Sequence, residues 1–146
     1  MRPVWGPLPG SISLLLDAAP DVVIVAAQHE VRAAGLTVAS VAADEGYLET
    51  DWYDVVTKRT VSARAEDFDH TVKLRLFADP REGKTRLVAE CVRRIAYDPS
   101  QPERDLERMV PDSTPEHAIL DSLFARLKVV FPPPRPRADS TGPQEP

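Results

Sequence analysis

Four carboxylates crowd residues 45–54, and two of them come closest to a catalytic arrangement. Glu49 and Asp51 stand two positions apart, so on an extended strand both side chains project from one face, roughly 7 Å apart. Two carboxylates at such a distance can share general acid and base work on a glycosidic bond. The pattern equally fits a structural role, in which both carboxylates pair with Lys73 and Arg75 on a neighbouring strand. We favour ion pairing and expect no enzymatic activity.

The other residues with reactive side chains are scattered along the chain. His29, His70 and His117 belong to no HExxH motif and no Cys/His ligand spacing, so no metal site is predicted. We expect His29 and His117 on helix surfaces. The single cysteine, Cys91, lies in an alternating apolar run and is expected to be a buried thiol. With no glycine-rich phosphate loop and no GxSxG motif, we predict no catalytic, cofactor-binding or metal-binding residues.

Composition excludes further classes of protein. The chain has 146 residues, with 18 Lys plus Arg against 23 Asp plus Glu and a formal net charge of −5. Phosphate binding needs clustered cations, and no long basic run occurs before the tail, so no nucleic-acid partner is expected. The most apolar stretch, residues 12–27, is interrupted by Asp17, Pro20 and Asp21. It is therefore expected neither to span a bilayer nor to act as a signal peptide.

Proline-rich segments mark both ends of the chain. Residues 1–10 hold three prolines and two glycines around Trp5, which predicts an extended, turn-rich lead-in and leaves open whether Trp5 packs on the domain. Residues 11–131 are predicted to form a single α+β domain. After Phe131 the sequence changes to PPPRPRADSTGPQEP, which cannot bury enough apolar surface to order itself. Residues 132–146 are therefore predicted to be a disordered tail.

Hydrophobic periodicity predicts an α+β fold in which an antiparallel sheet of four to five strands packs on two helices. The strands are expected over residues 11–18, 36–41, 46–54, 71–78 and 85–97, and the helices over residues 20–34 and 115–130. The order is β-α-β-β-β-β-α. Residues 55–70 are expected to form a long mobile loop, and residues 103–109 one short helix.

The strand predicted at residues 46–54, GYLETDWYD, organises the sheet. Strict alternation puts Leu48 and Trp52 on one face and the tyrosines on the other. Outward residues of this and the two following strands then assemble a patch, the candidate interaction face: Tyr47, Tyr53, Phe77, Val88 and Val92. Exposed apolar clusters of this kind often mark contact sites. The alternative is that the Pro-rich N-terminal segment, residues 55–70 or a second copy of the chain covers them.

A family resemblance is carried by a helix ending in AAGLTV, an acidic turn and a YLETDW strand. This stretch resembles the repeated domains of BamC, the lipoprotein accessory of the outer-membrane β-barrel assembly machinery, and similar bacterial envelope lipoproteins. The element order is also that of helix-grip domains, in which a curved sheet packs around the last helix. The resemblance implies a non-enzymatic domain that acts through protein contacts and is tethered to a membrane by a lipid on an N-terminal cysteine.

The sequence departs from this pattern, because its start holds no such cysteine and residues 12–27 are not expected to act as a signal peptide. A location in the bacterial envelope is therefore expected if an upstream leader was removed, and the cytoplasm otherwise. We predict a non-catalytic protein-interaction or scaffold domain, whose partner and oligomeric state the sequence leaves open. The alternative is a small hydrophobic-ligand binder that uses a cavity between the sheet and the C-terminal helix. Against that alternative, the inward leucines are numerous enough to fill the space as plain core.

Overall fold

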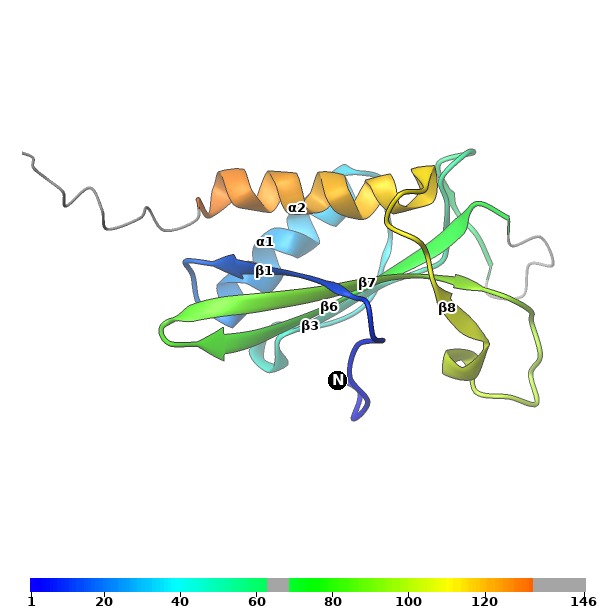
Figure 1. Cartoon of the computed structure of the whole chain (residues 1–146), viewed down its shortest axis with the longest axis horizontal. Helices are drawn as coiled ribbons and strands as arrows, with labels where there is room; N and C mark the ends of the chain where they lie inside the picture. The colour runs from blue at the N-terminus through cyan, green and yellow to red at the C-terminus, as the bar shows by residue number, and fades with distance from the viewer. Residues whose placement is uncertain (63–68, 133–146) are drawn as a thin grey trace, which may run out of the picture.

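One face of an antiparallel sheet carries two helices, and the N-terminal segment lies against the other face (Figure 1). The computed structural model describes residues 1–62 and 69–132. The strands and α-helices are β1 Ile12–Leu16, α1 Pro20–Ala33, β2 Val38–Ala42, β3 Tyr47–Thr50, β4 Tyr53–Asp54, β5 Arg59–Thr60, β6 Thr71–Arg81, β7 Lys84–Arg94, β8 Glu107–Met109 and α2 Ala118–Val130. Short 3-10 helices are η1 Ala43–Glu45, η2 Glu103–Leu106 and η3 Pro115–His117.

The main strand order is β1-β7-β6-β3-β2. Strand β8 pairs with the end of β7, while β4 pairs with both β5 and β6. The predicted α+β class, with an antiparallel sheet and two helices, is confirmed. The predicted strand number is wrong, because the described part of the chain holds eight strands rather than four to five. Strands β4, β5 and β8 have only two or three residues, too few to show a hydrophobic period.

The hydrophobic core lies between the sheet and the two helices. Apolar side chains at helical spacing on α1 and α2 pack on inward residues of β6 and β7, and the fully buried ones include Val23, Ala27, Leu120, Leu127, Leu74, Leu76 and Leu87. Gly35 adopts φ +98° and ends α1, as its position after the last turn predicts. Cys91 belongs to this core, where burial raises the pKa of its thiol to about 12. The prediction of a buried thiol is confirmed.

Strands β6 and β7 form a hairpin whose pairing continues to Arg81 and Lys84. Both residues of its turn, Glu82 and Gly83, have positive φ, the conformation that matches the twist of the two strands. Leu76 pairs with Ala89 on the helix side, and the register places Arg75 opposite Glu90 on the outer side. Inward and outward residues therefore alternate as the sequence indicates.

The strand predicted at residues 46–54 is broken into β3 and β4. Glu49 pairs with Arg75, and Tyr53 pairs with Val72. Between these two pairs, the chain of β3 and β4 therefore contains one residue more than β6 does. The buried Thr50 hydroxyl accepts a hydrogen bond from the Leu74 backbone N–H at 3.0 Å within this irregular stretch. One extra residue exchanges the two faces of a strand. Tyr53 consequently packs in the helix-side core.

Three other predictions need correction. Residues 55–70 are not a plain loop, because Arg59–Thr60 pairs with β4 as strand β5, while residues 63–68 lie outside the described residues. Only Glu103–Leu106 of the predicted short helix is helical, and a strand follows it. His117 is 1 % exposed rather than on a helix surface.

The predicted disordered tail covers residues 132–146, and residues 133–146 lie outside the described part of the chain. Disorder of the tail therefore stays a prediction. The proposed boundary at residue 10 also stays a prediction. No helix in the described ranges has the length and apolar character needed to cross a bilayer.

Candidate functional site

A buried cluster of charges centred on Arg75 occupies the outer face of the sheet, the face away from α1 and α2. The Arg75 guanidinium donates to both carboxylate oxygens of Glu107, at 2.6 and 2.7 Å. It also donates to Glu90 Oε2 at 2.9 Å and to Glu49 Oε1 at 3.1 Å. The side chains of Glu90 and Glu107 are 0 % exposed. Such bidentate, desolvated pairing fixes the positions of the groups that take part.

Arg104, on η2, is the second guanidinium of the cluster. It donates to Glu90 Oε1 at 2.9 Å and to Glu107 Oε1 at 3.1 Å, so each of these carboxylates joins Arg75 to Arg104. Burial by itself raises the pKa of the Glu90 carboxyl, but hydrogen bonds from Arg104, Arg75 and the Leu8 N–H outweigh it. The pKa of Glu90 therefore lies below its ordinary value, and the carboxylate stays charged.

The two guanidinium groups hold the indole ring of Trp5. The Arg104 Cζ atom lies 4.1 Å from the ring centroid, and the Arg75 Cζ atom lies 5.0 Å from it. Phe77 meets the indole edge at a centroid distance of 6.4 Å. Cation–π contacts of this kind stabilise by about 0.5–2 kcal/mol, more where water is excluded. We call Arg75, Phe77, Glu90 and Arg104 the Trp5 site.

The same residues also recognise the main chain on either side of Trp5. Arg104 Nη2 donates to the carbonyl oxygen of Gly6 at 3.0 Å, and the N–H of Leu8 donates to Glu90 Oε1 at 3.0 Å. One guanidinium and one carboxylate thus satisfy an acceptor and a donor of the main chain, which bends at Val4 and Trp5. Prolines within residues 1–10 restrict φ and so limit the conformations of the free segment.

Arg2 anchors the beginning of the segment. Its guanidinium pairs with Asp79 at 2.9 Å, and its backbone nitrogen donates to Glu45 Oε1 at 2.6 Å. The guanidinium also lies 5.4 Å from the Phe77 ring centroid. Residues 2–8 are therefore held at both ends and at the central tryptophan, so Trp5 packs on the domain, a point that the sequence left open.

A second aromatic ring is held in a similar way on the same face. Trp52 contacts two cations: the Nζ atom of Lys73 lies 4.9 Å from a ring centroid of the indole, and the Cζ atom of Arg94 lies 5.0 Å from a ring centroid. Its indole N–H donates to Glu103 Oε2 at 2.6 Å, and Lys73 pairs with the same carboxylate at 3.2 Å. The outer face thus carries two tryptophans that pack on cations.

The candidate interaction face is not an exposed patch. Tyr47, Phe77 and Val92 are 1 %, 1 % and 0 % exposed, Val88 is half-buried, and Tyr53 lies in the core on the opposite side of the sheet. The prediction of exposure is therefore wrong. The alternative, in which the Pro-rich N-terminal segment covers the face, holds for Phe77, which contacts Trp5.

The two carboxylates of the predicted pair, Glu49 and Asp51, have different surroundings in the structure. Glu49 binds Lys73 at 3.2 Å and Arg75 at 3.1 Å, as the ion-pairing prediction requires. Burial raises the pKa of Glu49, but a hydrogen bond from Tyr47 and the two cations outweigh it, so the pKa is lowered. Asp51 lies between β3 and β4 and makes no ion pair with any described residue. The pairing prediction is confirmed for Glu49 and wrong for Asp51.

Sequence reasoning missed Glu107, Arg104 and their contact with Trp5. Alternation in β6 and β7 predicts that Arg75 and Glu90 point outward, and it is the only signal for this site. Glu107 and Arg104 come from a segment without a sustained period. Their distance from Trp5 in sequence leaves no local pattern that could join them.

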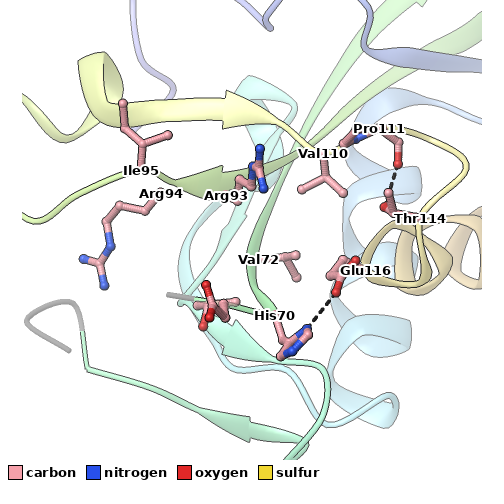
Figure 2. A pocket seen from close by; sticks show the side chains of 11 residues that line it. His70, Val72, Arg93, Arg94, Ile95, Val110, Pro111, Thr114 and Glu116 are labelled. Atoms are coloured by element: carbon pink, nitrogen blue, oxygen red, sulfur yellow. Dashed lines mark hydrogen bonds and ion pairs between the residues drawn. The ribbon is translucent and has the colours of Figure 1, made fainter. Parts of the chain in front are cut away.

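A separate cleft of about 890 Å³ opens where β6 begins and β7 ends, facing the start of α2 (Figure 2). His70 Nδ1 and Glu116 Oε2 lie 2.9 Å apart across it, and the Thr114 hydroxyl donates to the carbonyl of Pro111 at 2.7 Å. Val72 and Val110 supply apolar surface. Since these polar groups bond to one another, we assign the cleft no ligand.

The His70–Glu116 pair predicts a measurable pH dependence. The hydrogen bond to Glu116 raises the pKa of His70 above 6.5, with Asp69 and Asp54 contributing, and His70 lowers the pKa of Glu116. The pair therefore stabilises the fold above the ordinary pKa of a glutamate and below that of a histidine. It is lost when pH rises through the raised pKa of His70 or falls through the lowered pKa of Glu116.

We expect the Glu116→Gln variant to move the His70 titration midpoint down toward 6.5. NMR titration of the imidazole protons measures this midpoint, and the exposed His29 in the same spectra is the internal reference. An unchanged His70 midpoint in the variant would contradict the assignment of the ion pair.

Within the described ranges, no group of three or more His, Cys, Asp or Glu side chains is arranged to hold a metal ion. A scan of protein-family models finds no match to the chain, and no curated protein matches it significantly.

Proposed function

We propose that this chain is a non-catalytic protein-interaction domain that binds a tryptophan-bearing segment of a partner on the outer face of its sheet. Its own residues 2–8 occupy the Trp5 site when no partner is bound. The observation that carries the proposal is the position of Trp5, 4.1 Å from Arg104 and 5.0 Å from Arg75, with the neighbouring backbone bonded to Arg104 and Glu90.

The chemistry of the Trp5 site supports peptide binding. Tryptophan and arginine are the residue types most enriched among those that dominate binding energy at interfaces. The site satisfies one carbonyl and one N–H of a segment that belongs to no strand, so a segment of different sequence can make the same backbone contacts. Residues 1–10 precede β1, and they can leave the face without breaking any strand pairing.

The state of the carboxylates supports a non-catalytic role. Glu49 and Glu90 have lowered pKa values and accept hydrogen bonds from cations, so neither is poised to donate or take up a proton near neutral pH. The partner is inferred to be a protein rather than a nucleic acid, because each of the cations Arg75 and Arg104 is already paired with buried carboxylates. The association with a bacterial envelope and the helix-grip relationship, which the sequence resemblance implies, stay predictions.

Competition with the chain's own segment gives the experiment. A labelled peptide of residues 2–10 is titrated into the full-length protein and into its Trp5→Ala variant, with fluorescence anisotropy as the measurement. The unaltered protein is expected to show a Kd near 1 mM, because a tethered segment competes at an effective concentration on the order of 1 mM. Trp5→Ala weakens that competitor, so we expect peptide binding at least tenfold tighter.

The matched control is Val4→Ala, because Val4 lies beside Trp5 in the same segment and is fully exposed. It is expected to bind the peptide as weakly as the unaltered protein does. A peptide with alanine in place of tryptophan is expected not to bind either variant. If folded Trp5→Ala protein binds the peptide no better than Val4→Ala does, the proposal is wrong.

A further inference from the structure

The contacts of residues 2–8 show which positions of a bound segment depend on the identity of the residue. The side chain of Val4 is fully exposed, and nothing lies within 4 Å of the place that a Cβ on Gly6 would occupy. The two positions that flank Trp5 are therefore open to other residues. Arg2 is different, because both its guanidinium and its backbone nitrogen bond to the domain.

The end of β6 and the helix η1 form a subsite for the Arg2 guanidinium. Its Nη1 and Nη2 atoms donate to the two carboxylate oxygens of Asp79, at 2.9 and 3.2 Å, and Nη1 also donates to the Glu45 carbonyl at 3.0 Å. The Phe77 ring centroid lies 5.4 Å from its Cζ atom. A planar guanidinium can make the paired contacts with Asp79, whereas a lysine ammonium offers no such fork. We call Glu45, Phe77 and Asp79 the Arg2 subsite.

Phe77 connects the Arg2 subsite to the Trp5 site. An exposed ion pair alone contributes little binding energy, and the side chain of Asp79 is 51 % exposed. Phe77, however, contacts both Arg2 and Trp5, at 5.4 and 6.4 Å, and the main chain bends at Val4 and Trp5. An arginine three positions before a tryptophan is thus the spacing that brings both side chains to one ring.

The backbone contact after Trp5 adds a restriction. The N–H of Leu8, three positions after Trp5, donates to Glu90 Oε1 at 3.0 Å, and the Glu90 side chain is 0 % exposed. A proline has no N–H, so at this position it would remove one hydrogen bond from a buried carboxylate. The sequence has prolines directly before and after Leu8, at Pro7 and Pro9, but not at position 8 itself.

We infer that the Trp5 site and the Arg2 subsite together bind one sequence motif of the partner, in which an arginine stands three positions before a tryptophan and a residue other than proline stands three positions after it. This inference rests on the proposed function and names the partner segment as a basic, tryptophan-bearing peptide. Asp79 and the buried Glu90 are the acids that select it.

Peptides of residues 2–10, labelled at the C-terminus, test the motif by fluorescence anisotropy. The protein is the full-length Arg2→Ala, Trp5→Ala double variant, whose own segment lacks both side-chain anchors. In the peptide, Arg2→Ala is expected to weaken binding about fivefold and Arg2→Lys about twofold, because lysine keeps the charge and loses the paired contact. The Leu8→Pro peptide is expected to bind at least roughly tenfold more weakly. The Leu8→Ala peptide, which keeps the N–H, is the matched control and is expected to lose far less.

A change on the protein side tests the same contact. Asp79→Asn, added to the double variant, is expected to weaken the unaltered peptide about threefold and to leave the Arg2→Ala peptide unaffected, because both changes remove one interaction. Glu82→Gln is the matched control, since Glu82 is an exposed acid of the adjacent turn and does not bond to Arg2. It is expected to change neither affinity.

The outcomes separate this inference from the proposed function. Equal affinities for the unaltered and Arg2→Ala peptides, with tryptophan still required, would overturn the inference alone. Failure of every peptide to bind would overturn the proposed function and the inference with it. If the double variant does not fold, the Arg2→Ala single variant gives the measurement. Its weakened segment is expected to let the unaltered peptide bind about fivefold tighter than the unaltered protein does, and an unchanged affinity would overturn the inference.

Discussion

The Arg75→Met variant is expected to lose about 3–5 kcal/mol of its free energy of unfolding, because removing one partner leaves buried charges uncompensated. Glu107 loses its bidentate partner, and Glu90 and Glu49 each lose one hydrogen bond. Methionine fills a similar space but donates nothing to these carboxylates. Urea denaturation followed by circular dichroism measures the change.

Arg86→Met is the matched control, because Arg86 is an exposed arginine on the neighbouring strand β7. It is expected to change the free energy of unfolding by no more than about 0.5 kcal/mol. Adding Glu107→Gln to Arg75→Met removes one of the uncompensated charges, so part of the stability is expected to return. A loss under 1 kcal/mol in Arg75→Met would contradict the description of a buried, interdependent cluster.

The Gly46→Ala variant is expected to lose about 2–5 kcal/mol of its free energy of unfolding for two separate reasons. Gly46 has φ +68°, a conformation that costs an L-residue about 1–2 kcal/mol. A Cβ there would also lie 2.1 Å from the carbonyl oxygen of Ala78, a backbone atom of β6 that no rotamer change can move. The resulting displacement adds about 1–3 kcal/mol, as overpacking does elsewhere.

The Gly83→Ala variant separates the cost of the positive φ from the cost of the steric clash. Gly83 also has a positive φ, +84°, but nothing lies within 4 Å of its Cβ position. It is therefore expected to lose only the conformational part, about 1–2 kcal/mol. Equal losses in the two variants would show that β6 moves freely away from Gly46, contrary to its pairing with β3 on one side and β7 on the other.

Sequence periodicity predicted the elements whose two faces differ in polarity. In β6 and β7, leucines alternate with charged residues, and the register followed. In β3 and β4 the break escaped notice because Tyr47 and Leu48 are both buried, as are Trp52 and Tyr53. When apolar residues occupy both faces, the pattern cannot show where an extra residue shifts one face to the other.

For the Trp5 site, the sequence predicted the face of the sheet from which the side chains project, but not that these side chains are buried. Arg75 and Glu90 point outward as expected, and their exposure was assumed because the outer face of such a sheet commonly meets water. Its cover comes from segments that have no period of their own. Gly6 and Arg104 are 98 positions apart, so only the folded chain brings them together.

The long span between these contacts also orders events during synthesis. Trp5 and the residues of β1 leave the ribosome before their partners, which are Arg104 and strand β7. At about 5–20 residues per second, roughly 5–20 s pass between the synthesis of Trp5 and that of Arg104. Throughout that interval the nascent chain carries an uncovered tryptophan and an unpaired apolar strand. Trp5 and β1 thus stay without their partners until β7 and Arg104 have been made, and during that interval they are open to a chaperone or to aggregation.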